Sequence, residues 1–254
     1  MPDQFARTEI IFGSKAMEKL YKSRVAVFGI GGVGGYAVEA LVRSGIGTLD
    51  LIDGDKICLS NINRQIFATH KTLSQFKADA AEARIKEINP KAVVNKHILF
   101  FGPENADLLD FKDFDYIIDA IDAVEGKIEI AVRADKVGVP VVSAMGAGNK
   151  TDPTAFQVSD IYDTTVCPLA RIMRRELKKC GVKSLKVVYS TERPVRASEI
   201  SSETLEECGA VRETGLPPRR LVTGSNAFVP SVMGLILAGE AIKGLVGFYA
   251  QNKA

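Results

Sequence analysis

The sequence predicts an α/β fold built on a Rossmann-like, doubly wound and mainly parallel β-sheet, continued by extra strands and a C-terminal helix. Three observations predict it. Short β-branched runs alternate with segments of helical spacing over residues 24–143, as in parallel sheets with helices on both faces. A glycine-rich loop joins the first run to the first helix, and an aspartate follows the second run. The 254 residues, 46% of them hydrophobic, suffice for a sizeable core.

The order of the predicted elements follows from the spacing of the apolar residues. The helix expected at residues 34–43 carries one apolar stripe and is ended by Gly45. The helix expected at residues 74–88 has apolar side chains three and four positions apart, and it ends at Asn89 and Pro90. Around these helices, strands are predicted at residues 24–28, 48–52, 93–98, 116–118 and 139–143.

The second half of the chain has a different pattern. Strands are expected at residues 156–161 and 185–190, on either side of a basic helix at residues 169–179. Residues 191–224 are polar and aperiodic, and the sequence leaves open whether they are ordered before a substrate binds. We expect a single domain over residues 1–254, in which residues 1–150 bind a nucleotide and residues 151–254 contact the substrate and a second copy.

Charge and composition exclude several classes of protein. Lys and Arg number 33 against 31 Asp and Glu, so only a local basic patch could bind a nucleic acid. The first residues lack the apolar run of a signal peptide and no two cysteines form a C-x-x-C pair, so we expect a cytoplasmic protein. Glu240 and Lys243 interrupt the apolar stretch at residues 227–250, which predicts a buried or interface helix rather than a membrane span.

The glycine loop predicts a phosphate site. The sequence GIGGVG at residues 29–34 lies between a buried strand and an amphipathic helix, so backbone N–H groups gather at a helix N-terminus. Asp53 ends the second strand, where an acidic side chain can accept hydrogen bonds from a ribose. These features describe an NAD enzyme and an ATP enzyme equally well. The glycines that permit the turn are Gly29, Gly31, Gly32 and Gly34.

Three further residues favour ATP. Arg64 follows the second strand and Lys77 opens the next predicted helix, and both fall at the same edge of the sheet. Attack on the α-phosphorus of a triphosphate concentrates negative charge on the leaving pyrophosphate, and positioned cations stabilise that charge. Asp122 closes the D-A-I-D sequence after the fourth strand and places a carboxylate there that can hold Mg²⁺. We therefore predict that Arg64, Lys77 and Asp122 carry the chemistry.

Taken together, GIGGVG, D-G-D, SNINRQ, the lysine that follows and D-A-I-D resemble the adenylating superfamily related to ubiquitin-activating enzymes. The resemblance implies that the four glycines wrap the phosphates, Asp53 binds the ribose and Asp122 ligates magnesium. It also implies a homodimer in which an N-terminal arginine, here Arg7, reaches the neighbouring site. By the same resemblance the nucleotide site is completed by Asp55, Asn61, Arg64, Gln65 and Lys77.

The second half indicates the branch of the superfamily. The stretches GAGNKTDPT, DIYDTTVCPLARIMRRELKK, KVVYSTERP and LVTGSNAFVPSVMGL are similar to the family of tRNA threonylcarbamoyladenosine dehydratases. That resemblance implies ATP-dependent adenylation of a carboxylate on a modified adenosine in tRNA, followed by ring closure with net loss of water. A basic helix fits such a substrate, because phosphates of tRNA would bind along one face formed by Arg171, Arg174, Arg175 and Lys178.

Three other functions stay open at this point. A sulfur-carrier activator would adenylate a C-terminal Gly-Gly of a ubiquitin-like protein, although the cysteine pairs of such activators are missing here. An NAD(P) oxidoreductase and a non-catalytic nucleotide-binding scaffold are disfavoured by Arg64 and Asp122. The sequence does not decide which tRNAs are used, or whether K⁺ or Na⁺ or a sulfur-relay protein takes part. It assigns no role to Cys167 or Cys208.

Overall fold

The computed structural model describes residues 4–195 and 223–248, and its strands form a seven-stranded sheet of order β3-β2-β1-β4-β5-β7-β6. Neighbouring strands run parallel except for β6, which is antiparallel to β7. This confirms the predicted fold class, including the extra strands of the second half. The strands are β1 (Arg24–Phe28), β2 (Thr48–Ile52), β3 (Val93–His97), β4 (Tyr116–Asp119), β5 (Val141–Ala144), β6 (Phe156–Asp160) and β7 (Lys186–Ser190).

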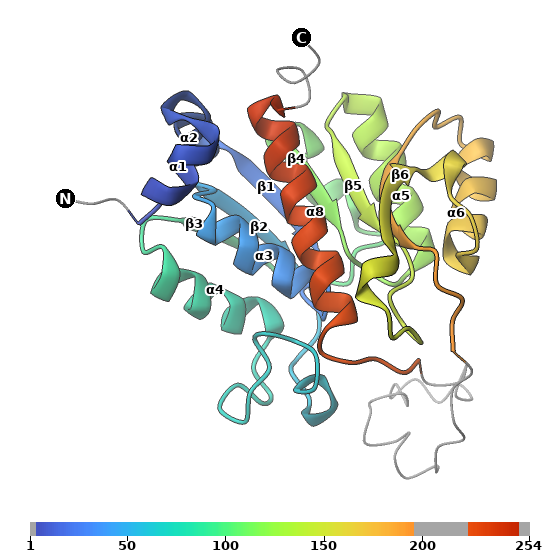
Figure 1. Ribbon diagram of the computed structural model, residues 1–254, viewed down its shortest axis with the longest axis horizontal. Coiled ribbons are helices and arrows are strands. Elements are labelled where there is room, and N and C mark those ends of the chain that lie inside the picture. The colour runs from blue at the N-terminus through green and yellow to red at the C-terminus, as the bar shows by residue number, and fades with distance from the viewer. Residues whose placement is uncertain (1–3, 196–222, 249–254) are drawn as a thin grey trace.

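Helices cover both faces of this sheet (Figure 1). Side chains of α2, α3, α4 and α8 share one core cluster on the first face, and α5 and α6 contribute to the clusters on the other face. The helix α1 packs against α2. The bounds are α1 (Ala6–Phe12), α2 (Ser14–Lys22), α3 (Gly34–Arg43), α4 (Lys77–Ile88), α5 (Val124–Val137), α6 (Pro168–Lys179) and α8 (Val229–Val246).

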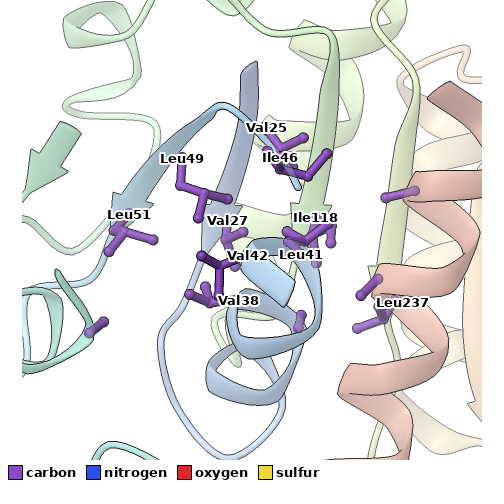
Figure 2. Packing of buried hydrophobic residues seen from close by; sticks show 14 of the residues in the cluster. Val25, Val27, Val38, Leu41, Val42, Ile46, Leu49, Leu51, Ile118 and Leu237 are labelled. Carbon is purple, nitrogen blue, oxygen red and sulfur yellow. The ribbon is translucent and has the colours of Figure 1, made fainter. Parts of the chain in front are cut away.

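Strand β1 is buried on both faces, as a doubly wound sheet requires. Val25 and Val27 join the cluster beneath α3 and α8, whereas Ala26 and Phe28 join the cluster that includes α5. Figure 2 shows the first cluster, in which side chains of β1, β2 and β4 meet those of α3 and Leu237 of α8. The hydrophobic effect of burying both faces therefore fixes β1 and the loop that follows it.

Two element boundaries differ from the prediction by more than one residue. The helix expected from residue 74 begins at Lys77, because Ser74 adopts a positive φ of 66° and Phe76 pairs with Lys56 in an isolated β-bridge. The strand expected from residue 139 begins at Val141. Val139 is occupied in closing the end of α5, where its N–H donates to the Ala134 carbonyl.

The apolar helix α8 is part of the core. Among the residues that the structure describes, it is the helix long and apolar enough to cross a membrane by length and composition. It packs against α3 and against β4 and β5. Its buried Glu240 lies 3.1 Å from the Lys186 ammonium and 2.5 Å from the Lys243 ammonium. Packing inside this fold thus accounts for its composition, as the sequence predicts.

Candidate active site

The predicted nucleotide residues lie where the winding of the sheet reverses. The chain leaves β1 toward α3 on one face and leaves the neighbouring β4 toward α5 on the other. In open α/β sheets, ligands bind beyond the carboxyl ends of the strands at such a point. The glycine loop follows β1, Asp53 follows β2 and Asp122 follows β4, so all three segments emerge at this edge.

At two positions of the loop, neighbouring backbone atoms lie so close that only glycine fits. Gly29 has a φ of 86°, and a Cβ on it would lie 2.7 Å from the Ala120 carbonyl oxygen. A Cβ on Gly34 would lie 1.8 Å from the Gly29 carbonyl oxygen. Gly31 and Gly32 are different, because added Cβ atoms there would meet side chains at 3.9 Å and 3.3 Å. The first pair shapes the turn, and the second pair keeps the backbone open to a ligand.

Asp53 holds the glycine loop in place. One of its carboxylate oxygens accepts a hydrogen bond from Ile30 N at 2.6 Å, and the other accepts from Asp55 N at 2.8 Å. Burial raises the pKa of Asp53, and the Lys77 charge and the two backbone N–H groups offset this only in part. Each oxygen keeps a lone pair, so the predicted bond to a ribose is compatible with these contacts.

Lys77 is buried at the start of α4 rather than solvated. Its Nζ lies 2.6 Å from Asp55 Oδ2 and 3.7 Å from Asp53 Oδ2, and its backbone N–H donates to the Asp55 carbonyl. The buried ammonium therefore sits at the carboxyl end of β2 together with both aspartates of the D-G-D sequence. Lys77 and the two aspartates are brought together as the sequence predicts.

Arg64 lies against the glycine loop. A Cβ on Gly32 would be 3.3 Å from Arg64 Cγ, so the aliphatic part of the arginine covers that glycine. Its Nη1 donates to the Ser60 carbonyl at 2.8 Å and to Asn63 Oδ1 at 2.9 Å. Both acceptors are neutral, so the positive charge of the guanidinium is available to an anionic ligand.

The two other predicted site residues of the SNINRQ sequence, Asn61 and Gln65, are also buried. Asn61 ends a short 3-10 helix, Leu59–Asn61, and its Oδ1 accepts from Cys58 N at 3.3 Å. Gln65 points toward the loop, because its Nε2 would be 3.9 Å from a Cβ on Gly31. Asn61 thus shapes the turn that carries Arg64, while Gln65 lies at the loop itself.

Asp122 is exposed in the segment between β4 and α5. Among residues 4–195 and 223–248, no group of three or more His, Cys, Asp or Glu side chains could hold a metal ion by itself. A single carboxylate suits Mg²⁺ that is also bound by substrate phosphates and water, which is the usual mode for this ion. The donor set at Asp122 therefore fits a nucleotide-bound Mg²⁺ and not a metal caged by protein alone.

The residues that join this site to the second half of the chain were not among those predicted from the sequence. Asn63 Nδ2 donates to the Ser225 carbonyl at 3.1 Å, and Asn226 Nδ2 donates to the Lys150 carbonyl at 2.8 Å. Pro230, in the first turn of α8, would lie 3.4 Å from a Cβ on Gly32. These contacts bring the segment before α8 against the nucleotide loop, and no local periodicity signals them.

The exposed basic face of helix α6 has fewer residues than predicted. Arg171, Arg175 and Lys178 are exposed, but Arg174 is half-buried and donates to the carbonyl and hydroxyl of Thr164. Of the predicted basic face, Arg171, Arg175 and Lys178 are therefore the exposed members, with Arg175 paired to Glu176, while Arg174 anchors the helix.

Arg7 and Cys167 lie on elements other than those that carry the predicted nucleotide residues. Arg7 is exposed on α1, which packs against α2. Cys167 is buried at the start of α6, and Cys208 lies outside the described residues. The structure thus gives neither Arg7 nor Cys167 a contact with the glycine loop within the described part of the chain.

A Rossmann-like sheet with an arginine against its glycine loop and a buried lysine at the carboxyl end of β2 is the arrangement expected of ATP-using, adenylating proteins. The model of the ThiF family matches residues 5–254, and the chain belongs to that family. The predicted resemblance to the adenylating superfamily is thereby confirmed.

Individual relatives match over nearly the whole chain. It is 40% identical over 248 residues to a tRNA threonylcarbamoyladenosine dehydratase of Bacillus subtilis, covering 97% of this chain and 96% of the relative. A crystal structure of the Escherichia coli tRNA N6-threonylcarbamoyladenosine dehydratase in complex with ATP is similar with a TM-score of 0.82 and 32% identity, covering 98% and 96% of the two chains. An adenylyltransferase and sulfurtransferase of Ogataea parapolymorpha is 34% identical, but the chain spans only 52% of that relative.

Proposed function

We propose that this protein is an ATP-dependent enzyme that dehydrates threonylcarbamoyladenosine in tRNA, by adenylating the carboxylate of the modified nucleoside. Relatives that carry this activity in their names match the chain from end to end, and one of them was solved with ATP. The observation that carries the proposal is Arg64, whose side chain lies on Gly32 with its guanidinium bonded to neutral acceptors.

The proposed first step is attack on the α-phosphorus of ATP. One carboxylate oxygen of the substrate forms a bond to this phosphorus, while the bond to the bridging oxygen breaks and pyrophosphate leaves. The glycine loop and the N-terminus of α3 bind the phosphates, and Arg64 stabilises the charge of the leaving group. Lys77 keeps its contact with Asp55 and still has ammonium protons for a phosphate oxygen.

The proposed second step closes a ring within the substrate. A nucleophile of the threonylcarbamoyl group bonds to the activated carbonyl carbon and loses its proton. AMP then departs with the oxygen that the carboxylate gives up, so the nucleoside has lost one water in all. The protein contributes positioning rather than a nucleophile, which agrees with the burial of Cys167.

The remaining nucleotide contacts are assigned by position. Asp53 binds the ribose, and Asp55, Asn61 and Gln65 line the site around the phosphates. Asp122 would hold Mg²⁺, which when bound reduces the negative charge of the phosphate oxygens. We assign nucleotide binding to residues 1–150, and substrate contacts together with part of the dimer contacts to residues 151–254.

The proposed partners are tRNA and a second copy of the chain. The exposed basic face of α6 would contact tRNA phosphates. For the homodimer, the support is α1, where Ile10 is 83% and Ile11 72% exposed next to Arg7. Burying such apolar side chains against a partner is favourable, and it would let Arg7 reach the neighbouring site. Since tRNA is the substrate, the proposed compartment is the cytoplasm.

The test is incubation of the protein with ATP, Mg²⁺ and threonylcarbamoylated tRNA, followed by mass spectrometry of the nucleosides. We expect a mass decrease of one water in the modified adenosine, dependent on ATP. An unchanged nucleoside would contradict the proposal. Omitting K⁺ or Na⁺, and adding a sulfur-relay protein, shows in the same assay whether either affects the rate.

The second candidate is activation of a sulfur-carrier protein. It is favoured by one observation, the similarity of 95% of this chain to part of the fungal adenylyltransferase and sulfurtransferase. Replacing the tRNA by a ubiquitin-like carrier with a C-terminal Gly-Gly distinguishes the two. An adenylated carrier together with an unchanged tRNA would favour this second function.

A further inference from the structure

A buried ion pair lies directly beneath the nucleotide site. Asp119 is the last residue of β4, Lys127 lies at the start of α5, and each is 1% exposed. Lys127 Nζ lies 3.0 Å from both carboxylate oxygens of Asp119. The end of β5 completes the cluster: the Ala144 carbonyl accepts from Lys127 Nζ at 2.8 Å, and Ser143 Oγ donates to Asp119 Oδ2 at 2.5 Å. One ammonium group therefore joins β4, β5 and α5.

The Asp119 carboxylate also controls the segment that leads to Asp122. Its Oδ1 accepts a hydrogen bond from Ile121 N at 3.3 Å, so the carboxylate fixes the turn of the chain beyond β4. The adjoining Ala120 is pressed against the glycine loop, because its carbonyl oxygen occupies the space where a Cβ on Gly29 would lie. A shift of this carboxylate would thus move Asp122 relative to the phosphate loop.

Stability alone does not explain such a pair. The cost of desolvating two charges offsets much of their attraction. Replacing a buried ion pair by apolar residues of similar size often leaves the stability of a protein unchanged or raises it. What a fully hydrogen-bonded pair adds is one defined geometry, since the Lys127 ammonium reaches four acceptors on two strands. The pair also sits at the strand ends where ligands bind.

We propose that Lys127 is a positioning residue: it orients Asp119, and Asp119 sets the Ala120–Asp122 segment so that Asp122 meets the metal of a bound Mg²⁺–nucleotide complex. The inference rests on the proposed function for the metal site at Asp122. Lys127 itself is too buried to touch the nucleotide, so its effect passes through Asp119 and the backbone of Ile121.

The test measures nucleotide binding rather than turnover. Lys127→Met alone leaves the Asp119 charge buried and unpaired, which is strongly destabilising. The informative variant is therefore the apolar pair Asp119→Leu with Lys127→Met, checked for folding by its melting temperature. A fluorescent ATP analogue is titrated with EDTA and then with increasing Mg²⁺. We expect binding without Mg²⁺ to change by less than about twofold, and the Mg²⁺ needed for half-maximal enhancement to rise about tenfold.

Two comparison variants make the result specific. Asp50→Asn disrupts an equally buried carboxylate network in β2, and it should lower the melting temperature without changing the Mg²⁺ titration. Asp122→Asn should weaken the Mg²⁺ response by itself, and adding the apolar pair to it should have little further effect.

The outcomes distinguish the metal site at Asp122 from the positioning role of Lys127. If Asp122→Asn keeps the wild-type Mg²⁺ response, the proposed metal site is wrong and the role of Lys127 falls with it. If Asp122→Asn loses the response while the folded apolar pair retains it, the metal site stands and the positioning role of Lys127 is wrong.

Discussion

Asp50, inside strand β2, and Asp53, just beyond its end, show two uses of a buried carboxylate. Burial alone would raise the pKa of Asp50, but hydrogen bonds from Arg24, His97 and Asn95 outweigh it and hold the pKa at about 2. Burial raises the pKa of Asp53, and its partners do not fully offset the effect. The first carboxylate is saturated by side chains of neighbouring strands, whereas the second bonds backbone N–H groups of the site.

The difference follows from position along the strand. In the middle of a parallel sheet, side chains of adjacent strands lie in register and can satisfy a carboxylate completely, which stabilises the fold. At the carboxyl end the chain turns away into loops, and polar groups there orient the backbone and keep capacity for a ligand. We therefore expect changes at the strand ends to affect nucleotide chemistry and changes inside the strands to affect stability.

Arg64→Ala should have the largest effect. Removing the guanidinium of the side chain that covers Gly32 should lower ATP–pyrophosphate exchange by about 10³-fold or more, as for other transition-state arginines. The melting temperature should stay close to that of the wild type. Arg43→Ala is the matched control, because Arg43 is an exposed arginine at the end of α3 away from the glycine loop, where it pairs with the buried Glu39. Normal exchange in the Arg64 variant would remove this residue from the mechanism.

Gly34→Ala should impair both the loop and the fold. The new Cβ would lie 1.8 Å from the Gly29 carbonyl oxygen, so the loop must move. We expect weaker ATP binding and a loss of about 2 to 3 kcal/mol in the free energy of unfolding. Gly239→Ala in α8 has nothing within 4 Å of its new Cβ and should be neutral or stabilising. Urea unfolding and ATP titration of both variants measure the contrast, and equal behaviour of the two would contradict the proposed constraint.

Asp50→Asn should reduce stability in a pH-dependent way. The folded pKa of Asp50 is depressed from 3.8 to about 2, so its contribution is fully present above pH 3.8 and is lost as the pH falls toward 2. This shift corresponds to about 2 kcal/mol. The raised pKa of Asp53 gives stability the opposite pH dependence. Variant and wild type are therefore compared at each pH, where the contribution of Asp53 is common to both. Urea unfolding at neutral pH should separate them, and the gap should narrow near about pH 3. A gap that widens in acid would show that Asp50 is not the source.

Neutralising the exposed basic face of α6 should have the smallest effect per residue. Arg171→Ala, Arg175→Ala and Lys178→Ala should each weaken tRNA binding a few-fold and reduce its salt dependence by about one counterion. Arg174→Ala should instead lower the melting temperature, because Arg174 anchors α6 to Thr164. Filter binding of tRNA at several salt concentrations measures these slopes. A slope that none of the three substitutions changes would place the tRNA contacts elsewhere on the protein.

Most of the fold and much of the site could be predicted because their signals are local. Helix α3 has the predicted bounds, since its apolar stripe and the glycines on both sides lie in adjacent sequence. Lys77 also lies where expected, although its pairing with Asp55 came only from the structure. The link between Asn63 and Ser225 had no such signal, because hydrogen bonds between distant segments leave no period in the sequence.

The sequence by itself determined the alternation of strands and helices, the phosphate loop and the order of charged residues along the strand ends. It did so because strand and helix periodicities and glycine loops are properties of short segments. Tertiary structure decided which charges are committed to the fold and which face a ligand. Asp119 is closed off by Lys127 and Ser143 while Asp122 is exposed, and Arg174 is anchored while Arg171 is free to reach solvent. Burial and pairing arise from contacts between segments far apart in the chain. Only the folded structure therefore shows which of these charged residues are paired and which are exposed.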